Sequence, residues 1–285
     1  MRVLVLGAKG MLGQELVKIF SDNVVTAWDK DDLDITNREE VFQKIREQAP
    51  DVILNAAAYN AVDKAEEEEG VAFAVNAEAV NFLAQAASEI GSLLVHYSTD
   101  YVFDGAREAG YQESAEPSPQ SAYARSKAQG EKYLQEIGGR FYLIRLSRLF
   151  GKPGAGEGSK KSFVDSILKL ATPTQGSGEA KKELEVVDEE LSSPTYAPDL
   201  GKLTKGLIDR KLPYGIYHGA NSGACTWYEF ANEALKTKNI SCTLKPVKAD
   251  RFPRKALRPK YSVLLNTKLP PTRDWKEALR EYLTS

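Results

Sequence analysis

Two side chains four residues apart, Tyr123 and Lys127, have the chemistry needed to exchange a proton with a substrate. They fall in a stretch with helical periodicity, so the phenol and the ammonium lie on one face about one turn apart. A nearby ammonium favours the phenolate, which predicts a tyrosine pKa below its ordinary value of about 10. Because such a pair also occurs on amphipathic surface helices, further residues are needed to support a catalytic role.

The segment Ser98-Thr99-Asp100 supplies this support, because it ends an apolar run typical of a buried strand. Open α/β sheets bind ligands at the carboxyl ends of their strands. There the Thr99 hydroxyl can hold a carbonyl oxygen while Tyr123 protonates it and a dihydronicotinamide delivers hydride to the carbon. These residues together predict a carbonyl reductase.

A glycine-rich loop, G-x-x-G-x-x-G, follows the first apolar run directly and opens a helix. Its first glycine can make a tight turn, the second lets the backbone approach a pyrophosphate, and the third permits close packing of strand and helix. A glycine-rich turn without a ligand is the alternative. The loop residues predicted to bind a dinucleotide are Gly7, Lys9, Gly10, Met11, Leu12 and Gly13.

The choice between NADH and NADPH is left open by residues at the end of the second predicted strand. Asp29 can accept hydrogen bonds from an adenosine ribose and would repel a 2′-phosphate, whereas Lys30 and Lys9 can pair with that phosphate. Small side chains after the third strand leave room for the nucleotide, although close packing alone also explains them. The further residues predicted to bind the cofactor are Asp34, Ile35, Ala56, Ala57 and Ala58.

Alternating strands and amphipathic helices must position these residues, which predicts an α/β fold of the Rossmann type with a doubly wound parallel sheet. All its strands are predicted to be fully buried, and an apolar stripe that begins at Val71 is predicted to pack on the sheet. The predicted strands are Arg2–Leu6, Val24–Trp28, Asp51–Ala56, Leu93–Ser98 and Phe141–Leu146. The predicted helices centre on Gln14–Phe20, Arg38–Gln48, Val71–Ile90 and Ala124–Ile137.

The composition changes after Gly151, which predicts a dinucleotide-binding domain at 1–151 and a mainly substrate-binding portion at 152–285, with some elements returning to the sheet. Gly154–Lys161 and Thr172–Lys182 are predicted loops. Farther on, Tyr214–His218 is a predicted strand, and Thr226-Trp-Tyr-Glu229 predicts a capping box that starts a helix.

Charge and cysteine content exclude several classes of function. The 38 basic and 40 acidic residues give a net charge of −2 without a basic block, so we expect no nucleic acid partner. No apolar stretch approaches the ~18 residues of a membrane span, so we expect no membrane partner. Cys225 and Cys242 are too few for a disulfide framework, which fits a reducing compartment, and neither has metal-ligand spacing, so we expect no metal site. The first apolar run is far shorter than the core of a signal peptide, so we expect a cytoplasmic location.

Nearly end to end, the chain resembles the dTDP-4-dehydrorhamnose reductases, which are extended short-chain dehydrogenases of deoxysugar nucleotide synthesis. The segments that carry this resemblance are Asn55–Glu67, His96–Gly105, Tyr123–Lys127, Ser193–Leu200 and Arg258–Leu269. The resemblance implies an oxidoreductase that uses NADPH or NADH to reduce the 4-keto group of a nucleoside-diphosphate 4-dehydro-6-deoxysugar, foremost dTDP-4-dehydro-L-rhamnose. It also implies a catalytic set of Thr99, Tyr123 and Lys127, with Tyr97 near the cofactor and Asp100 near the sugar.

Two positions separate this chain from related sugar-nucleotide enzymes or from the family pattern. Dehydratases carry Asp-Glu after the threonine, but here Tyr101 follows Asp100, which favours reduction over elimination. The family usually ends its fifth strand with Arg-Thr-Ser-Trp, where this chain has Arg145-Leu-Ser-Arg148. Arg148 is therefore predicted to stack against the substrate or pair with its diphosphate, the alternative being a surface salt bridge.

The alternatives to a reductase are a related epimerase and a non-catalytic nucleotide-binding regulatory subunit, since a fold does not decide function. Among oligomeric states, we consider a homodimer.

Overall fold

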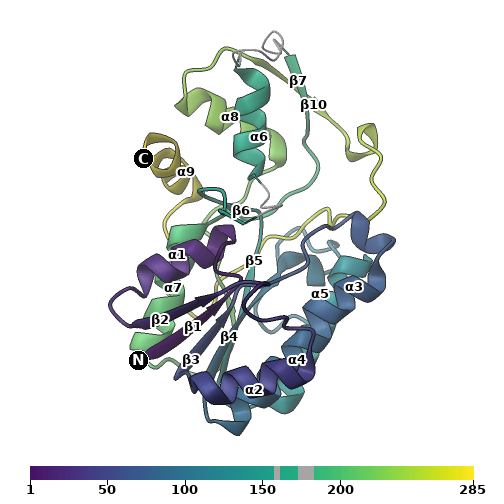
Figure 1. Cartoon of the computed structure of the whole chain (residues 1–285). Helices are drawn as coiled ribbons and strands as arrows, with labels where there is room; N and C mark the ends of the chain where they lie inside the picture. Colours follow the sequence, from purple (N-terminus) through teal and green to yellow (C-terminus); the bar gives the residue numbers. More distant parts are fainter. Residues whose placement is uncertain (157–160, 173–182) are drawn as a thin grey trace.

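A six-stranded parallel sheet forms the centre of the computed structural model, which describes residues 1–156, 161–172 and 183–285. Its strand order is β2-β1-β3-β4-β5-β9, and every neighbouring pair is parallel (Figure 1). The predicted α/β fold with a parallel, Rossmann-type sheet is therefore confirmed. The strands are β1 Arg2–Leu6, β2 Val24–Trp28, β3 Val52–Asn55, β4 Leu93–Thr99, β5 Phe141–Leu146 and β9 Gly215–His218.

Helices cover both faces of this sheet. The pair α1 and α7 packs on one face through Leu16, Leu200 and Leu207, and α2, α4 and α5 cover the other face through residues such as Ile45 and Leu83. Because helices cover both faces of the sheet, β1 and β3 consist almost entirely of apolar residues, and β4 begins with the apolar run Leu93–Val95. The helices around the sheet are α1 Met11–Ile19, α2 Arg38–Gln48, α3 Glu69–Phe73, α4 Ala79–Glu89, α5 Ala122–Ile137 and α7 Ala197–Asp209.

The prediction that all strands are fully buried is wrong for β2. This strand lies at the edge of the sheet and pairs only with β1, so its residues are partly exposed and Val24 is 68% exposed. A β-branched run therefore identified the strand, but it did not reveal the position of the strand in the sheet.

The prediction of one continuous helix over Val71–Ile90 is also wrong. A π-helical turn, Ala74–Glu78, separates α3 from α4. The wider turn displaces the apolar stripe, so Val71 is 50% exposed and lines a cavity instead of joining the core. Within the π turn, the Asn76 amide donates to the Tyr59 carbonyl at 3.0 Å and to Ser126 Oγ at 3.0 Å. The irregular turn thereby ties the loop after β3 to helix α5.

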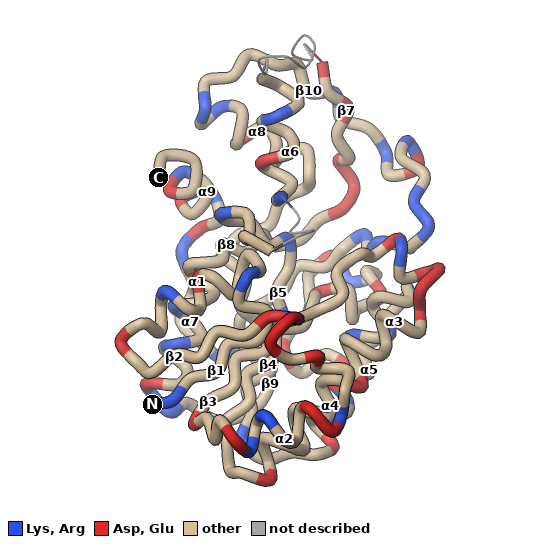
Figure 2. The backbone as a smooth tube through the Cα atoms, viewed as in Figure 1, with Lys and Arg blue, Asp and Glu red and all other residues tan. Residues whose placement is uncertain are grey.

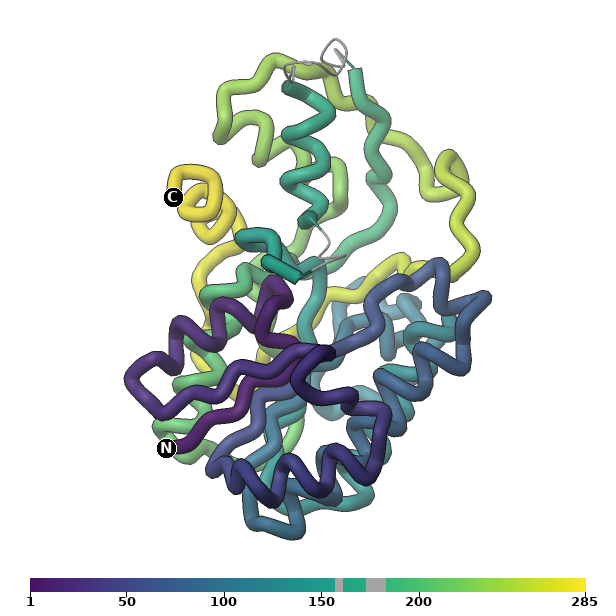
Figure 3. The backbone as a smooth tube through the Cα atoms, in the orientation of Figure 1, coloured from purple at the N-terminus to yellow at the C-terminus, as the bar shows by residue number. Residues whose placement is uncertain are grey.

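A smaller lobe sits beyond the carboxyl ends of the strands (Figures 1 and 3). Phe150, Phe230 and Trp275 form part of its core. The predicted capping box is confirmed, since Thr226 Oγ1 accepts from the Glu229 N–H at 3.1 Å and the Glu229 carboxylate accepts from the Thr226 N–H at 2.8 Å. The lobe contains α6 Phe163–Ala171, α8 Trp227–Thr237, α9 Trp275–Thr284, the pair β7 Glu183–Val187 and β10 Thr243–Val247, and the pair β6 Leu149–Phe150 and β8 Thr195–Tyr196.

The chain passes between the sheet and the small lobe more than once. After β8 it returns to the sheet through α7 and β9, which pairs with β5, and then re-enters the small lobe at α8. The segment that follows β10 comes back to the sheet side near α3 (Figure 3). There Arg258 pairs with Asp63, which lies between β3 and α3, at 2.6 Å. Most of the predicted loops Gly154–Lys161 and Thr172–Lys182 lies outside the described residues.

Charged residues of both signs are spread along the chain in the sheet side and in the small lobe (Figure 2), in keeping with the net charge of −2. Of the helices in the described residues, none combines the length and apolarity that a membrane crossing requires.

Candidate active site

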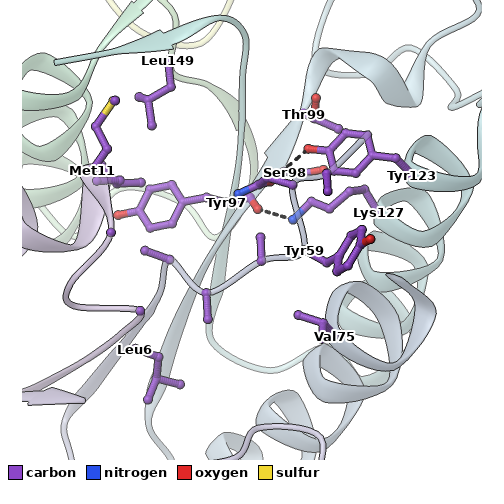
Figure 4. A pocket seen from close by; sticks show the side chains of 18 of the residues that line it. Leu6, Met11, Tyr59, Val75, Tyr97, Ser98, Thr99, Tyr123, Lys127 and Leu149 are labelled. Carbon is purple, nitrogen blue, oxygen red and sulfur yellow. Dashed lines mark hydrogen bonds between the residues drawn. The ribbon is translucent and has the colours of Figure 1, made fainter. Parts of the chain in front are cut away.

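A cavity of about 1160 Å³ opens at the carboxyl ends of the strands, between the sheet and the small lobe (Figure 4). It brings together every predicted site residue except Gly13. The predicted cofactor residues in its lining are Gly7, Lys9, Gly10, Met11, Leu12, Asp29, Lys30, Asp34, Ile35, Ala56, Ala57, Ala58, Tyr97, Tyr123 and Lys127. Those predicted to bind substrate, Thr99, Asp100 and Arg148, line the same cavity.

The glycine loop forms one end of this cavity. Gly7 has a φ of +71°, and a Cβ there would lie 2.8 Å from the Ala57 nitrogen, so a side chain would collide with the loop after β3. At Gly13 a Cβ would overlap the Gly7 carbonyl, so this glycine packs α1 against the loop and does not line the cavity. Helix α1 begins at Met11 with no side-chain cap, which leaves its first N–H groups available to an anion.

The end of β2 presents a carboxylate and two lysines to the cavity. Asp29 accepts from the backbone N–H of Lys9 at 3.0 Å and of Lys30 at 2.9 Å, so it fixes the two turns that meet there. The Lys9 ammonium pairs with Asp31 at 3.3 Å on the surface. Groups suited to a ribose hydroxyl and to a 2′-phosphate therefore coexist at this end.

Helix α5 carries Tyr123, Lys127 and Glu131 at four-residue spacing on its buried face. The Tyr123 hydroxyl donates to the Asn60 side chain at 3.4 Å, and its ring meets that of Tyr101 edge to face. Burial raises the pKa of Tyr123 above its ordinary value, so the predicted lowering is wrong for this structure. The phenol lies in a dry site, which disfavours its charged form and keeps it protonated.

Lys127 is 2% exposed, and its ammonium donates to the Tyr97 carbonyl at 2.6 Å (Figure 4). Its second neighbour is His96 Nε2, at 3.3 Å. Burial lowers the pKa of Lys127 to about 8. The lysine therefore titrates close to physiological pH and is bound to strand β4.

Thr99 and Asp100 sit where β4 ends. The Thr99 hydroxyl accepts from the Tyr101 N–H at 3.2 Å and donates to the Asp100 carboxylate at 3.1 Å. The other Asp100 oxygen accepts from Ser147 at 2.8 Å and from Ser262 at 2.6 Å. Burial raises the pKa of Asp100, although these hydroxyls act against the rise. The carboxylate thus orients the threonine within a fully bonded set.

Arg148 is half-buried at the small-lobe side of the cavity, in a left-handed conformation with φ of +44°. Its guanidinium donates to the Cys225 carbonyl at 2.8 Å and to the Glu190 carbonyl at 2.6 Å, and it lies 3.9 Å from the centre of the Trp227 ring. Among the described residues it has no ion pair within 4 Å, so the surface salt bridge is ruled out there. Two of its nitrogens are thus committed to the backbone, and an aromatic ring covers one of its faces.

Two groups of functional interest were not predicted. Trp227 lines the cavity beside Phe163, with the ring centres 4.5 Å apart. The feature of the sequence that could have indicated Trp227 is an aromatic residue directly after the capping residue Thr226. The second group is the fully buried Glu131–Arg145 pair at 2.7 Å, to which Ser98 Oγ donates at 2.5 Å. The four-residue step from Lys127 to Glu131 could have indicated it.

The site can hold a carbonyl oxygen beside one phenol, one hydroxyl and one buried amine, next to a glycine loop shaped for a dinucleotide. Within the described residues, no group of three or more histidine, cysteine, aspartate or glutamate side chains is arranged to hold a metal ion.

The chain is similar over its whole length to known reductases. A sequence model described as the RmlD substrate binding domain matches residues 1–285. The dTDP-4-dehydrorhamnose reductase of Aggregatibacter actinomycetemcomitans is 36% identical over 299 residues, which cover 98% of this chain and 97% of that protein.

Two solved structures are similar throughout. The dTDP-4-dehydrorhamnose reductase of Clostridium acetobutylicum superposes with a TM-score of 0.92 at 37% identity, covering 100% of this chain and 99% of the other. The enzyme of the same name from Bacillus anthracis, in complex with NADP, superposes with a TM-score of 0.91 at 34% identity, covering 99% and 98%.

Proposed function

The chain belongs to the family of dTDP-4-dehydrorhamnose reductases, and from this premise we propose that it reduces the 4-keto group of a nucleoside-diphosphate 4-dehydro-6-deoxysugar. It is an NAD(P)H-dependent oxidoreductase. The foremost candidate substrate is dTDP-4-dehydro-L-rhamnose, which the reaction would convert to dTDP-L-rhamnose. The observation that carries the proposal is the single cavity that joins the glycine loop to Thr99, Tyr123 and Lys127.

The lining of the cavity fits a dinucleotide. A Cβ at Gly7 would occupy the space next to Ala57, and the first turn of α1 offers unpaired N–H groups. The small side chains of Ala56, Ala57 and Ala58 leave the floor open. Lys9, Asp29 and Lys30 would hold the adenosine end, and Tyr97 and Lys127 the nicotinamide end. A bound dihydronicotinamide supplies the hydride that the carbonyl carbon receives.

Protein groups supply the proton and hold the keto oxygen. The Thr99 hydroxyl donates to Asp100 in the structure, and on substrate binding it would turn its proton to the keto oxygen. The Tyr123 phenol transfers its proton to that oxygen as the carbon is reduced. The C=O double bond becomes C–H and O–H, and the phenol becomes a phenolate that regains a proton from solvent. The raised pKa of Tyr123 favours this direction, because the donor is protonated before each turnover.

The sugar nucleotide lies, in this proposal, between Asp100 and the small lobe. The family pattern has a tryptophan at the position of Arg148, and here Trp227 offers an indole from α8 instead. Arg148 then acts on the substrate through this ring, which it contacts face on, more than through a direct bond to the diphosphate.

The test is to follow the absorbance of the dihydronicotinamide when dTDP-4-dehydro-L-rhamnose is added, with NADPH and NADH in parallel. Tyr123→Phe should retain cofactor binding and lose at least ~100-fold in turnover, the usual scale for a positioned acid. The matched control is Tyr133→Phe on the same helix, whose hydroxyl bonds Glu78 away from the cavity and whose loss should leave turnover unchanged. Cofactor binding without turnover of any 4-keto sugar nucleotide would refute the proposal and favour a regulatory subunit.

We also propose that residues 1–151 bind mainly the cofactor and 152–285 mainly the substrate, that the protein acts in the cytoplasm, and that it forms a homodimer. Analytical ultracentrifugation of the purified chain tests the dimer, and fluorescence microscopy of a tagged chain tests the location.

A further inference from the structure

A buried histidine that the mechanism above does not use lies behind the catalytic lysine. His96, on β4, is completely buried, and its two ring nitrogens have different neighbours: Nδ1 is 3.1 Å from the Asn55 amide and Nε2 is 3.3 Å from Lys127 Nζ. Asn55 itself ends β3 and is 1% exposed. The three side chains therefore form a line that runs from the core to the cavity.

The direction of the hydrogen bonds in this line follows from Asn55. The side-chain oxygen of Asn55 accepts from the Ala57 N–H at 3.2 Å, so the side-chain NH₂ group is the one that faces His96. An NH₂ group only donates, which makes His96 Nδ1 the acceptor. The single proton of the neutral ring is then on Nε2 and points at Lys127. The amine form of Lys127 can accept this bond, whereas the ammonium form would oppose it.

We propose that Asn55 and His96 act as positioning residues that present an N–H donor to Lys127 and so favour its neutral amine form. The surroundings of Lys127 support this. Glu131, one turn farther along α5, acts to raise the pKa of Lys127, but its carboxylate is engaged by Arg145 of β5 and by Ser98. Among the described residues, no carboxylate lies within 4 Å of the Lys127 ammonium.

The other titratable groups around this line add no counter-charge to Lys127. Tyr123 on α5 and Tyr97 on β4 are neutral because burial raises the pKa of both. Asp100, beyond β4, is bonded by Ser147 and Ser262. Burial keeps the pKa of His96 well below its ordinary value, so the ring stays neutral. The consequence for catalysis rests on the proposed function, whereas the protonation of Lys127 does not.

The experiment is an NMR titration of Lys127 in protein labelled with ¹³C at the lysine Cε, with the signal assigned by its absence in Lys127→Met. We expect a midpoint near pH 8 in the wild type. In His96→Leu the donor is gone, and the midpoint should rise by about one pH unit, a tenfold gain in proton affinity. His218→Leu, at a buried histidine on β9, is the matched control and should leave the midpoint in place.

Asn55→Asp tests the tautomer directly. Aspartate keeps the acceptor for Ala57 but accepts from Nδ1–H, so the ring proton moves and Nε2 becomes an acceptor for the ammonium. The midpoint of Lys127 should rise further than in His96→Leu. If the aspartate charge acted on Lys127 directly, Asn55→Asp would raise the midpoint equally with His96 present and with His96 replaced by leucine. The double variant Asn55→Asp/His96→Leu therefore separates the effect of the charge from the effect of the tautomer. Equal rises in both backgrounds, or no rise in His96→Leu, would overturn the proposal.

The pH profile of turnover gives the catalytic readout. If the proposed function holds, the inflection assigned to Lys127 in kcat/KM should move with the NMR midpoint in both variants. A merely structural role for His96 would lower kcat/KM at every pH and leave the inflection where it is. Wild-type protein that titrates as expected but turns over no keto sugar would refute the proposed function alone.

Discussion

Replacing Glu131 by glutamine should strongly destabilise the protein, because it removes the charge that compensates a buried cation. Arg145 is 1% exposed and its guanidinium makes three contacts of 2.7 to 3.2 Å with the Glu131 carboxylate. Its remaining bond, to the Glu113 carbonyl at 3.2 Å, is neutral. Breaking one partner of such a pair costs about 3–5 kcal/mol. We expect the lower end of this range, because the glutamine oxygen still accepts one bond.

Denaturant unfolding followed by circular dichroism measures this loss, and the double variant Glu131→Leu/Arg145→Met identifies its cause. Removing both charges leaves no unpaired ion, so the double variant should be more stable than Glu131→Gln. The control is Glu136→Gln, which removes an exposed 3.8 Å pair with Lys132 on the same helix and should cost less than about 0.5 kcal/mol. A loss below about 1 kcal/mol in Glu131→Gln, or a double variant that is no better, would refute the reasoning.

Three further perturbations test other parts of the structure. Between about pH 8 and 10.5 the unfolded chain keeps a proton on Lys127 that the folded chain releases. The free energy of unfolding should therefore rise with pH in this window by about 3 kcal/mol more in the wild type than in Lys127→Met, measured by urea unfolding at each pH. Parallel plots of unfolding free energy against pH for the two proteins would contradict this. Gly13→Ala should lower the melting temperature and cofactor affinity, because its Cβ overlaps the Gly7 carbonyl, whereas Gly70→Ala, where the space is open, should leave the melting temperature unchanged. Trp227→Leu should raise KM for the sugar nucleotide roughly tenfold, the loss expected for one aromatic contact, and leave the affinity for NADPH unchanged in fluorescence titrations; an unchanged KM would remove Trp227 from the substrate site.

Local pattern was enough to predict the sheet and the glycine loop. Strands β1, β3 and β4 are buried on both faces, so their apolar runs are almost uninterrupted, and the loop glycines are required by contacts with adjacent segments such as Ala57. The same rule failed at β2, because an edge strand can have the same β-branched composition. It also failed at the π turn, since one extra residue in a turn leaves no mark on an apolar stripe.

The contents of the site were predictable where they lie close together in the chain. Tyr123 and Lys127 share a helix, and Thr99 follows a strand, so spacing alone placed them on one side of the sheet. The contact of Arg148 with Trp227 joins segments that are far apart in the chain, so it has no signal in local spacing. The raised pKa of Tyr123 was missed for a related reason: desolvation depends on the tertiary structure, and only the neighbouring charge was visible.

The chain returns to the sheet at β9 after part of the small lobe, and this order determines when each part of the cavity can form during synthesis. Strand β9 completes the sheet when α6, β7 and β8 of the small lobe have been translated but α8, β10 and α9 have not, and Ser262, which bonds Asp100 next to Thr99, emerges later still. A nascent chain that stops within α8 therefore has its whole cofactor floor but an incompletely bonded Asp100. Because domains generally fold as units during synthesis, we expect the glycine-loop end of the cavity to form before Asp100 gains all of its hydrogen bonds.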